Sequence, residues 1–384
     1  MSEAQVFEMC EKLLQEDGPA ALVMRQWLVP VEGKDAVVFP PTYPTETKSG
    51  YNIDYSGQEI SVCQIDSVGS QANRMEPIFK KDPIDPEKNN RYWKLVPQIV
   101  IKVGGKELNL LDAGHRAGDA VVRFSPHCRD LWDAFTGWQQ DGNAEPMARI
   151  APTSIVFGAW DSRATQAKLP RIVRSVIRAY NVRELTRSAL FEPPLHYVDE
   201  GVLSEELDKG EGEKNPLSQE GFRHSPARAH GGIKVLGEIR RDASLSLVAV
   251  RALGVKPKEG EKPEQTHTRQ LKLRRYILGL ALVAFTHRDF SQLDLREGCL
   301  LRPDPDCSTE WRVVPFEGKE QPLELKPEDA LNYAEGAAKD FEVEVERATV
   351  EFNREQAERW LRLKKEDRDK RRRQGPVIDQ ELAK

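Results

Sequence analysis

Apolar and polar positions along the chain follow two different periods, which together predict an α+β fold. Apolar side chains recur at helical spacing over residues 1–16, and a second, longer apolar helix is predicted over 271–285. Residues 21–31 and 60–66 have the pattern of strands. The run 153–160 is short, apolar and rich in β-forming residues, so it predicts a buried strand.

The segment 163–187 is compatible with both periods. Its apolar residues stand at i, i+3, i+4, i+7, i+8 and i+11, which is the spacing of one helix face. Ile and Val dominate the segment, however, and favour a strand equally. A helix would place Arg171, Arg174 and Arg178 opposite the apolar stripe, and a strand would still point Arg174 and Arg178 the same way. Either structure buries an apolar side and leaves a row of arginines outside.

The charge of this segment differs from that of the whole chain. The 384 residues have a formal net charge of −5, yet residues 163–187 contain seven basic residues and a single acid, Glu184. A solvated face with surface ion pairs would be the ordinary explanation, but acids that could form such pairs are scarce nearby. Because the arginine fork matches phosphate geometry, the local excess of cations predicts binding of a polyanion.

A second candidate site is the start of the helix that follows the strand 60–66. Ser67 and Ser70 are both suitable N-cap residues for this helix. The free N–H groups and positive dipole end of a helix can hold phosphate, although an ordinary capped helix also explains the pattern. Three polar residues of this region are candidate contacts: Gln71, Asn73 and Arg74.

Residues 112–125 combine Asp and His, which could indicate a metal or hydrolase site. No adjacent His-Asp pair, HExxH motif or second His cluster accompanies them. We therefore expect His115 and Arg116 to contact nucleic acid or to form a satisfied polar cluster.

Several classes of protein lack their sequence signatures here. Walker A and GxGxxG patterns are absent, and His287-Arg288-Asp289 matches the kinase catalytic loop without any other kinase motif. The five cysteines are scattered and form no CxxC pair, which indicates a reducing compartment. No run long enough for a membrane span and no signal peptide are found. We expect a cytoplasmic protein that binds neither cofactor nor metal.

Two charged segments interrupt the periodic pattern. Residues 199–220 contain eight acids and two lysines and predict a solvated loop. Residues 339–373 predict one charged helix whose basic end could touch nucleic acid.

Five motifs together resemble a known family, the CRISPR-associated RAMP proteins of type I-G (formerly I-U) systems. These proteins are Cas-seven-type backbone subunits of the Cascade surveillance complex. The resemblance runs from about residue 20 to about residue 335 and rests on PPTY (40–43), DSVGSQANRMEP (66–77), DAGHRAGDAVVRFS (112–125), PTSIVFGAWDSR (152–163) and KLPRIVRSVIRAYNV (168–182).

The resemblance implies a modified RRM-like (ferredoxin-like) core with long insertions. The core would span 1–335, with an inserted thumb at 188–235 or, second, at 39–57, and 336–384 would be a charged C-terminal helix or tail. Several copies would stack head-to-tail along one CRISPR RNA (crRNA), which pairs with target DNA in antiviral defence. The other partners would be a large subunit, a guide-processing subunit and a recruited helicase-nuclease.

The pattern and the resemblance together predict a non-catalytic, crRNA-binding subunit. The predicted RNA-binding residues are Gln71, Asn73, Arg74, His115, Arg116, Arg163, Lys168, Arg171, Arg174 and Arg178. The alternative is a metal-dependent ribonuclease of the related type III kind, whose loop aspartate would help to cut bound target RNA. The candidates for that role are Asp54, Asp66 and Asp161.

Overall fold

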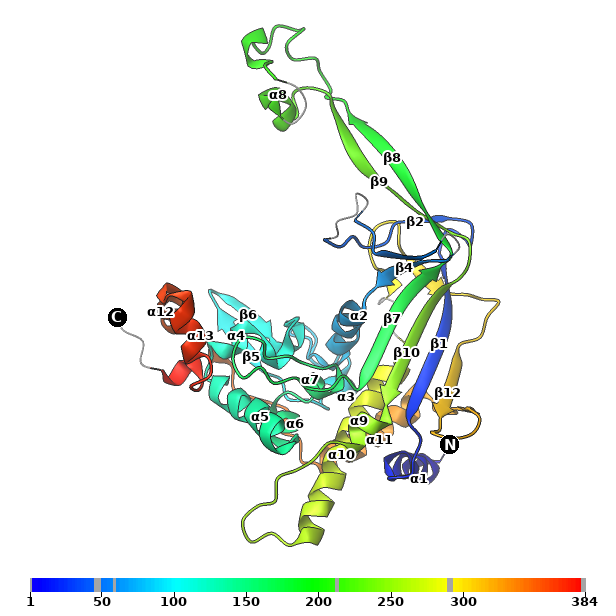
Figure 1. Ribbon diagram of the computed structural model, residues 1–384, viewed down its shortest axis with the longest axis vertical. Helices are drawn as coiled ribbons and strands as arrows, with labels where there is room; N and C mark the ends of the chain where they lie inside the picture. The colour runs from blue at the N-terminus through cyan, green and yellow to red at the C-terminus, as the bar shows by residue number, and fades with distance from the viewer. Residues whose placement is uncertain (1, 45–49, 58–59, 211–213, 289–292, 381–384) are drawn as a thin grey trace.

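The computed structural model describes residues 2–44, 50–57, 60–210, 214–288 and 293–380 and confirms the α+β class. Within these residues the largest unit is an antiparallel sheet in the order β13-β12-β1-β10-β7-β4-β3, with β11 also paired to β1 (Figure 1). Its strands are β1 (Ala21–Pro30), β3 (Ile53–Ser56), β4 (Ile60–Asp66), β7 (Val173–Tyr180), β10 (Ile239–Ser246), β11 (Leu301–Pro303), β12 (Glu310–Val314) and β13 (Gln321–Pro322). The RRM-like arrangement of this core stays a prediction.

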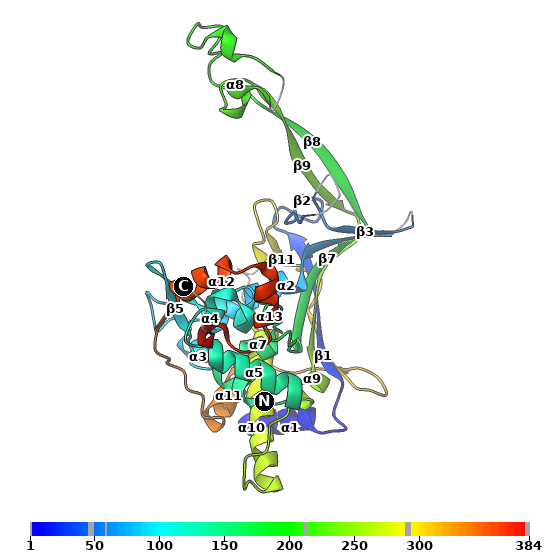
Figure 2. The same ribbon diagram turned by 60° about the vertical axis from the view of Figure 1, so that its left-hand side comes forward.

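Helices cover one face of the sheet and leave the other face open (Figure 2). Side chains along β10 alternate strictly between buried and partly exposed positions, as expected for a strand covered on one side. The covering helices are α1 (Glu3–Leu14), α2 (Val68–Met75), α7 (Thr153–Val156), α9 (Leu247–Arg251), α10 (Pro263–Thr286) and α11 (Pro327–Asp340).

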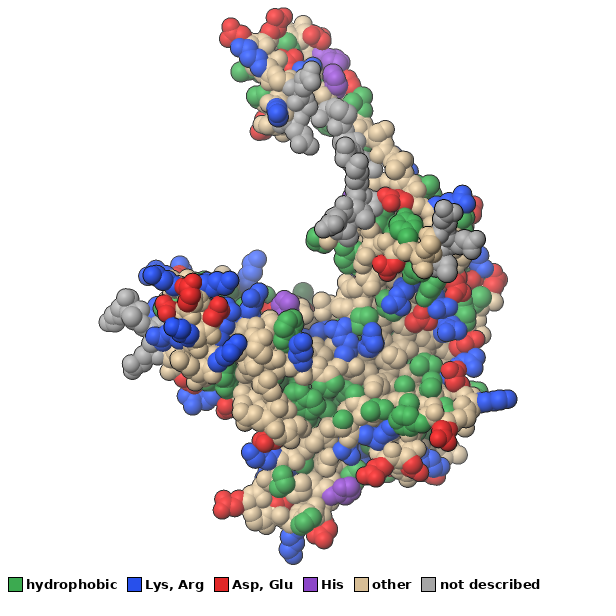
Figure 3. Space-filling model, in the orientation of Figure 1, with side chains coloured by type: hydrophobic (Ala, Val, Ile, Leu, Met, Phe, Trp, Pro, Cys, Tyr) green, Lys and Arg blue, Asp and Glu red, His purple; other side chains and the backbone are tan. Residues whose placement is uncertain are grey.

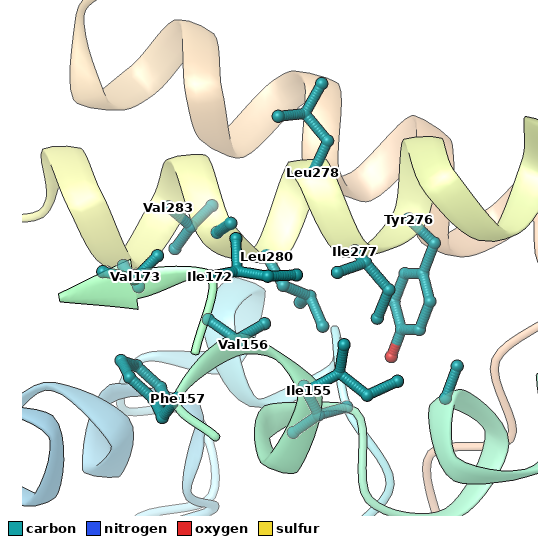
Figure 4. Packing of buried hydrophobic residues seen from close by; sticks show 14 of the residues in the cluster. Ile155, Val156, Phe157, Ile172, Val173, Tyr276, Ile277, Leu278, Leu280 and Val283 are labelled. Atoms are coloured by element: carbon teal, nitrogen blue, oxygen red, sulfur yellow. The ribbon is translucent and has the colours of Figure 1, made fainter. Parts of the chain in front are cut away.

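The core lies between α10 and the elements packed on it (Figure 4). Ile155, Val156 and Phe157 are fully buried there, next to Ile277 and Leu280 of α10. The strand predicted over 153–160 is therefore wrong, because these residues form the short helix α7 and a following loop. A short apolar run that is buried on all sides has no period that separates strand from helix.

The ambiguous segment 163–187 forms a turn and loop up to residue 172 and strands after it. Val173–Tyr180 is β7 and Val182–Phe191 is β8, so the helical alternative is wrong. In the sheet, Arg174 lies opposite Ser244 of β10, and Arg178 lies between Arg240 of β10 and Gln64 of β4.

A two-stranded hairpin projects from the sheet, and its far end lies well away from the rest of the molecule (Figures 1 and 2). It consists of β8 and β9 (Ser225–Val235), and β2 (Val37–Val38) pairs with β9 at the base. The backbone N–H of Gly232 donates to the buried Tyr51 hydroxyl at 3.2 Å and fixes this base. The head contains a 3₁₀ turn (Glu205–Leu207) and α8 (Pro216–Gln219), so the described residues of the acidic segment 199–220 belong to the hairpin head.

The remaining elements form a lobe beside the sheet. It contains a small sheet of β5 (Val100–Val103), β6 (Lys106–Asn109) and β14 (Val350–Glu351). Its helices are α3 (Asn90–Trp93), α4 (Ala120–Arg123), α5 (Cys128–Asp141), α6 (Glu145–Ile150), α12 (Arg354–Arg362) and α13 (Lys365–Arg371), and its 3₁₀ turns are Glu76–Phe79, Leu110–Asp112, Arg116–Gly118 and Val377–Asp379.

The C-terminal region differs from the single charged helix predicted over 339–373. Helix α11 ends at Asp340, the chain then pairs with β5 through β14, and α12 and α13 follow. The predicted boundary between 335 and 336 falls inside α11, which packs on α10. Asp289 of the kinase-like tripeptide lies outside the described residues. In the part of the chain that the structure describes, every helix is too short or too polar to cross a membrane.

The contact between α10 and α11 gives a test of the packing. A Cβ at Gly279 of α10 would lie 2.9 Å from Ala334 Cα in α11, whereas a Cβ at the exposed Gly336 of α11 meets no atom within 4 Å. Gly279→Ala should therefore lower the free energy of unfolding by about 1–3 kcal/mol through overpacking. Gly336→Ala should raise it by about 0.5–1 kcal/mol, since alanine costs less helix entropy. Urea unfolding of both variants measures this, and changes of the same sign would contradict the close approach.

Candidate nucleic-acid interface

The open face of the sheet presents the basic residues of β7. Arg174 is exposed and Arg178 is half-buried, and both line a groove on this face together with Tyr180 and Ser244. Alternation along β7 turns Val173, Ser175 and Ile177 to the helices and the two arginines away from them. The sequence prediction that these arginines share one face agrees with this geometry.

Acids on the open face are already paired with other cations. Asp242 contacts Arg240 at 2.9 Å and Arg25 at 3.6 Å. Glu310 contacts Arg312 at 3.1 Å. Among the described residues, no ion pair involves Arg174 or Arg178, so the positive charge of β7 is left without a counter-charge from the protein.

The loop before β7 continues this cationic surface with Arg163, Lys168 and Arg171. Arg163 and Lys168 are exposed, and the Lys168 ammonium lies 4.7 Å from the centre of the Trp160 ring. Arg171 is half-buried against Gly158, whose φ of +78° and lack of a side chain let the guanidinium stem approach. Burial lowers the pKa of Arg171, and the guanidiniums of Arg116 and Arg174 lower it further.

We call these five residues, Arg163, Lys168, Arg171, Arg174 and Arg178, the basic row. Within the described ranges, none of their side chains forms an ion pair, and the same holds for Arg183 and Arg187 at the hairpin base. Basic side chains elsewhere in the chain are widely paired, as Arg91, Arg240 and Arg269 show. The row is therefore a concentration of cations that the protein does not neutralise itself.

Asp161 and Trp160 shape the loop that holds Arg163 and Lys168. The buried Asp161 carboxylate accepts hydrogen bonds from the backbone N–H and the hydroxyl of Thr165, both at 2.8 Å, and so closes a turn. Trp160 is 52% exposed, which is unusual for so large an aromatic side chain. Trp160 is not among the residues that the sequence predicted to bind RNA, although an exposed ring can stack on a base. Its position between Gly158 and a turn that carries a lysine is the sequence signal that could have identified it.

Gln71 and Arg74 of α2 are engaged inside the protein. Gln71 is buried, donates to the Asp66 carboxylate at 2.7 Å and accepts from the Ser175 hydroxyl at 2.8 Å. Arg74 pairs with Asp66 at 3.2 Å and donates to the backbone carbonyls of Asp294 and Leu295, both at 3.3 Å. Burial raises the pKa of Asp66, and its bonds to Gln71 and Arg74 oppose this. These residues support β7 from its covered side.

Arg116 is also a supporting residue. Its guanidinium is buried and donates to Glu76 at 2.7 Å, to the Gly158 carbonyl at 3.3 Å and to the Asn73 side chain at 3.1 Å. Burial raises the pKa of Glu76 to about 7, although Arg116 lowers it. The backbone of Arg116 is left-handed, with φ +52°, which a non-glycine residue adopts at a cost. Arg116 thereby holds the loop that carries Arg171, and its direct contact with RNA is not supported.

Asn73 and His115 remain exposed beside this ion pair. The ten predicted residues thus divide into two groups. Seven lie along or beside the basic row, whereas the buried Gln71 and Arg116 and the partly exposed Arg74 hold the elements that carry it. Polar residue type does not separate these groups in a sequence, because burial depends on distant segments.

The aspartates of the ribonuclease alternative lie apart in the fold. Asp54 is exposed on β3, while Asp66 and Asp161 are buried and hydrogen-bonded as described. The described residues contain no group of three or more His, Cys, Asp or Glu side chains with the arrangement of a metal site.

The basic residues border a hollow of the molecule. Figure 3 shows Lys and Arg side chains gathered below the projecting hairpin and on the lobe that faces it. The hollow is open to solvent and runs between the hairpin and the lobe, so it suits an extended ligand.

The Glu76–Arg116 pair predicts a pH-dependent stability defect. Arg116→Met should lower the free energy of unfolding by about 3–5 kcal/mol at about pH 8.5, because it leaves Glu76 buried without a partner. Near pH 6 Glu76 is protonated in both folded proteins and the loss is smaller. Above pH 7 Glu76 ionises in the folded wild type. In the folded variant the pKa of Glu76 is higher still, so Glu76 keeps its proton, and the resulting loss in the free energy of unfolding grows with pH.

Urea unfolding at the two pH values checks this prediction. His115→Ala is the matched control, since the neighbouring His115 is exposed and its loss should change stability by less than about 0.5 kcal/mol. An equal loss at both pH values in Arg116→Met would show that the pair does not control Glu76.

Comparison with known proteins agrees with the resemblance in pointing to a CRISPR-associated protein. No curated protein matches the chain. Residues 22–184 match the family described as CRISPR-associated protein GSU0053, a stretch that begins in β1 and includes β4, α2, the Arg116 turn and all of β7. The match supports a CRISPR-associated protein with a role in CRISPR defence.

Proposed function

We propose that this protein is the crRNA-binding backbone subunit of a type I CRISPR Cascade complex, of the Cas-seven type found in type I-G systems. The observation that carries the proposal is the basic row, whose five cations have no carboxylate partner among the described residues. In a protein with a net charge of −5, such a row needs an anionic ligand from outside. The match of residues 22–184 to a CRISPR-associated family makes a guide RNA the fitting polyanion.

The row suits contacts to the sugar-phosphate backbone. An RNA-guided complex reads sequence through base pairing, so its protein needs contacts that do not depend on sequence. Arginine and lysine side chains on a strand and a neighbouring loop provide such contacts. Trp160 adds one exposed aromatic ring, which can stack on any base.

The proposal extends to the assembly. Several copies would stack along one crRNA and support its pairing with target DNA, together with a large subunit, a guide-processing subunit and a recruited helicase-nuclease. The β8–β9 hairpin would serve as the thumb, because it projects from the sheet and β8 is exposed over nearly its whole length. The subunit itself would not catalyse a reaction.

Removal of the row should weaken RNA binding regardless of sequence. In the Arg163→Ala, Arg171→Ala, Arg174→Ala triple variant, each lost phosphate contact should reduce the slope of log affinity against log salt by roughly 0.7. Fluorescence anisotropy with labelled oligouridylate RNA at several salt concentrations measures the slope.

Arg312→Ala is the matched control for this experiment. Arg312 lies on the same open face but pairs with Glu310 at 3.1 Å and Glu320 at 3.6 Å, so its loss should leave the slope unchanged. A triple variant that binds like the wild type would refute the assignment of the surface.

Composition of the purified complex tests the backbone role. Expressed with its partners, the protein should elute as a large ribonucleoprotein with several copies of this chain and one RNA of uniform length. Native mass spectrometry and gel analysis of the extracted RNA measure both. With complementary RNA and Mg²⁺ the complex should leave the RNA intact; regular cleavage that is lost in Asp54→Ala, Asp66→Ala or Asp161→Ala would favour the ribonuclease alternative.

A further inference from the structure

The C-terminal helices lie outside the matched stretch 22–184, yet they pack beside the loop of the basic row. The backbone N–H of Asn353, which precedes α12, donates to the Phe124 carbonyl at 2.7 Å. Phe124 also forms a small apolar cluster with Trp360 and Val377. Arg129 of α5 pairs with Asp379 at 2.8 Å. These contacts fix the C-terminal segment against the end of α4, where Arg123 is located.

Arginines from three separate segments lie at this junction. Arg123 ends α4, Arg163 belongs to the loop before β7, and Arg372 follows α13. Arg123 donates to the backbone carbonyl of Arg163 at 3.5 Å. Burial lowers the pKa of Arg123, and the charges of Arg372 and Arg163 oppose its protonation while Asp161 favours it. The charges of Arg163 and Arg372 thus both act on Arg123.

The cluster retains hydrogen-bond donors that the described protein atoms do not use. The Nε atoms of Arg123 and Arg372 are buried and have no hydrogen-bond partner among the described residues. Arg372 pairs through Nη1 with Asp369 at 2.8 Å, so its charge is neutralised only in part. The positive charge that remains at this junction is offset by a phosphate, whose oxygens accept from several arginines at once.

The cluster is continuous with the basic row because Arg163 belongs to both. The surrounding C-terminal segment is also cationic: residues 354–373 contain ten basic residues against five acids. Lys370 and Arg373 are exposed next to Arg372, and the lobe that carries α12 and α13 shows many basic side chains toward the hollow (Figure 3). A ligand that follows the row therefore meets further positive charge at its end.

We propose that Arg123, Arg163 and Arg372 form a second phosphate site, at which the C-terminal helices hold the same nucleic-acid strand that the basic row binds. This inference rests on the proposed function, since it assigns a further contact to its ligand. The ligand is a phosphodiester of single-stranded RNA, because the site continues a row suited to an extended strand. The C-terminal segment is then a part of the nucleic-acid interface that the matched stretch does not contain.

The experiment measures the salt dependence of oligouridylate RNA binding by the full chain carrying Arg372→Ala and, separately, Arg123→Gln. Each variant should reduce the log–log slope by roughly 0.7 and weaken binding roughly fourfold at about 0.15 M salt, as expected for one lost phosphate contact. Arg354→Ala is the control: it removes the same charge from the same segment, but Arg354 lies at the start of α12 with its side chain 86% exposed, outside the junction with α4, so the slope should not change.

Two further measurements make the outcomes decisive. Thermal unfolding identifies a variant that fails through misfolding, and Arg372→Ala, which loses only a partly exposed ion pair, should retain the wild-type midpoint. If the triple variant of the basic row weakens binding but Arg372→Ala and Arg123→Gln keep the wild-type slope, the second site is refuted and the proposed function stands. If the wild type binds no RNA, both the proposed function and the second site are refuted.

Discussion

The alternation of side chains along β7 is the constraint on which the interface depends. A strand in an antiparallel sheet that is covered by helices on one side must send every second side chain to the open side. In β7 these positions hold Arg174 and Arg178, and the covered positions hold Val173, Ser175 and Ile177. The same register that builds the core therefore fixes the spacing of the cations. Because Asp242 and Glu310 are occupied by other arginines, the open face retains positive charge.

A second set of polar residues works inside the protein to hold this surface in place. Arg241 donates to Ser175, Ser175 to Gln71 and Gln71 to Asp66, so a buried chain of hydrogen bonds joins β10, β7, α2 and β4. Burial lowers the pKa of Arg241 to about 10. The Glu76–Arg116 pair likewise holds the loop at Gly158 in place, because Arg116 also donates to the Gly158 carbonyl. Buried hydrogen-bond networks such as the chain from Arg241 to Asp66 help to specify one arrangement of the elements around them.

The sequence predicts the elements whose period is long and one-sided, including α1, β1, β4, α2 and most of α10, as well as the shared direction of Arg174 and Arg178. It does not predict α7, since Ile155 and Val156 are buried on all sides and show no period. It also cannot separate Arg116 from Arg171. Both are arginines in polar stretches of this chain, and the first is buried by contacts with distant residues such as Glu76, forty residues away. The break of the C-terminal helix depends on the pairing of β14 with β5, which is again a contact between distant segments.

The β8–β9 hairpin is long, so a small rotation at its base would move its far end by a large distance. A ten-residue strand extends about 33 Å at the usual rise, so a tilt of about 10° at the base displaces the far end by about 6 Å. That displacement is close to the distance between neighbouring nucleotides in an extended strand. The contacts at the base include the Tyr51 hydroxyl with Gly232 and the pairing of β2 with β9, and they set the direction of the hairpin. Under the proposed function, a small change at this base would move the acidic head along the bound strand without altering any residue of the basic row.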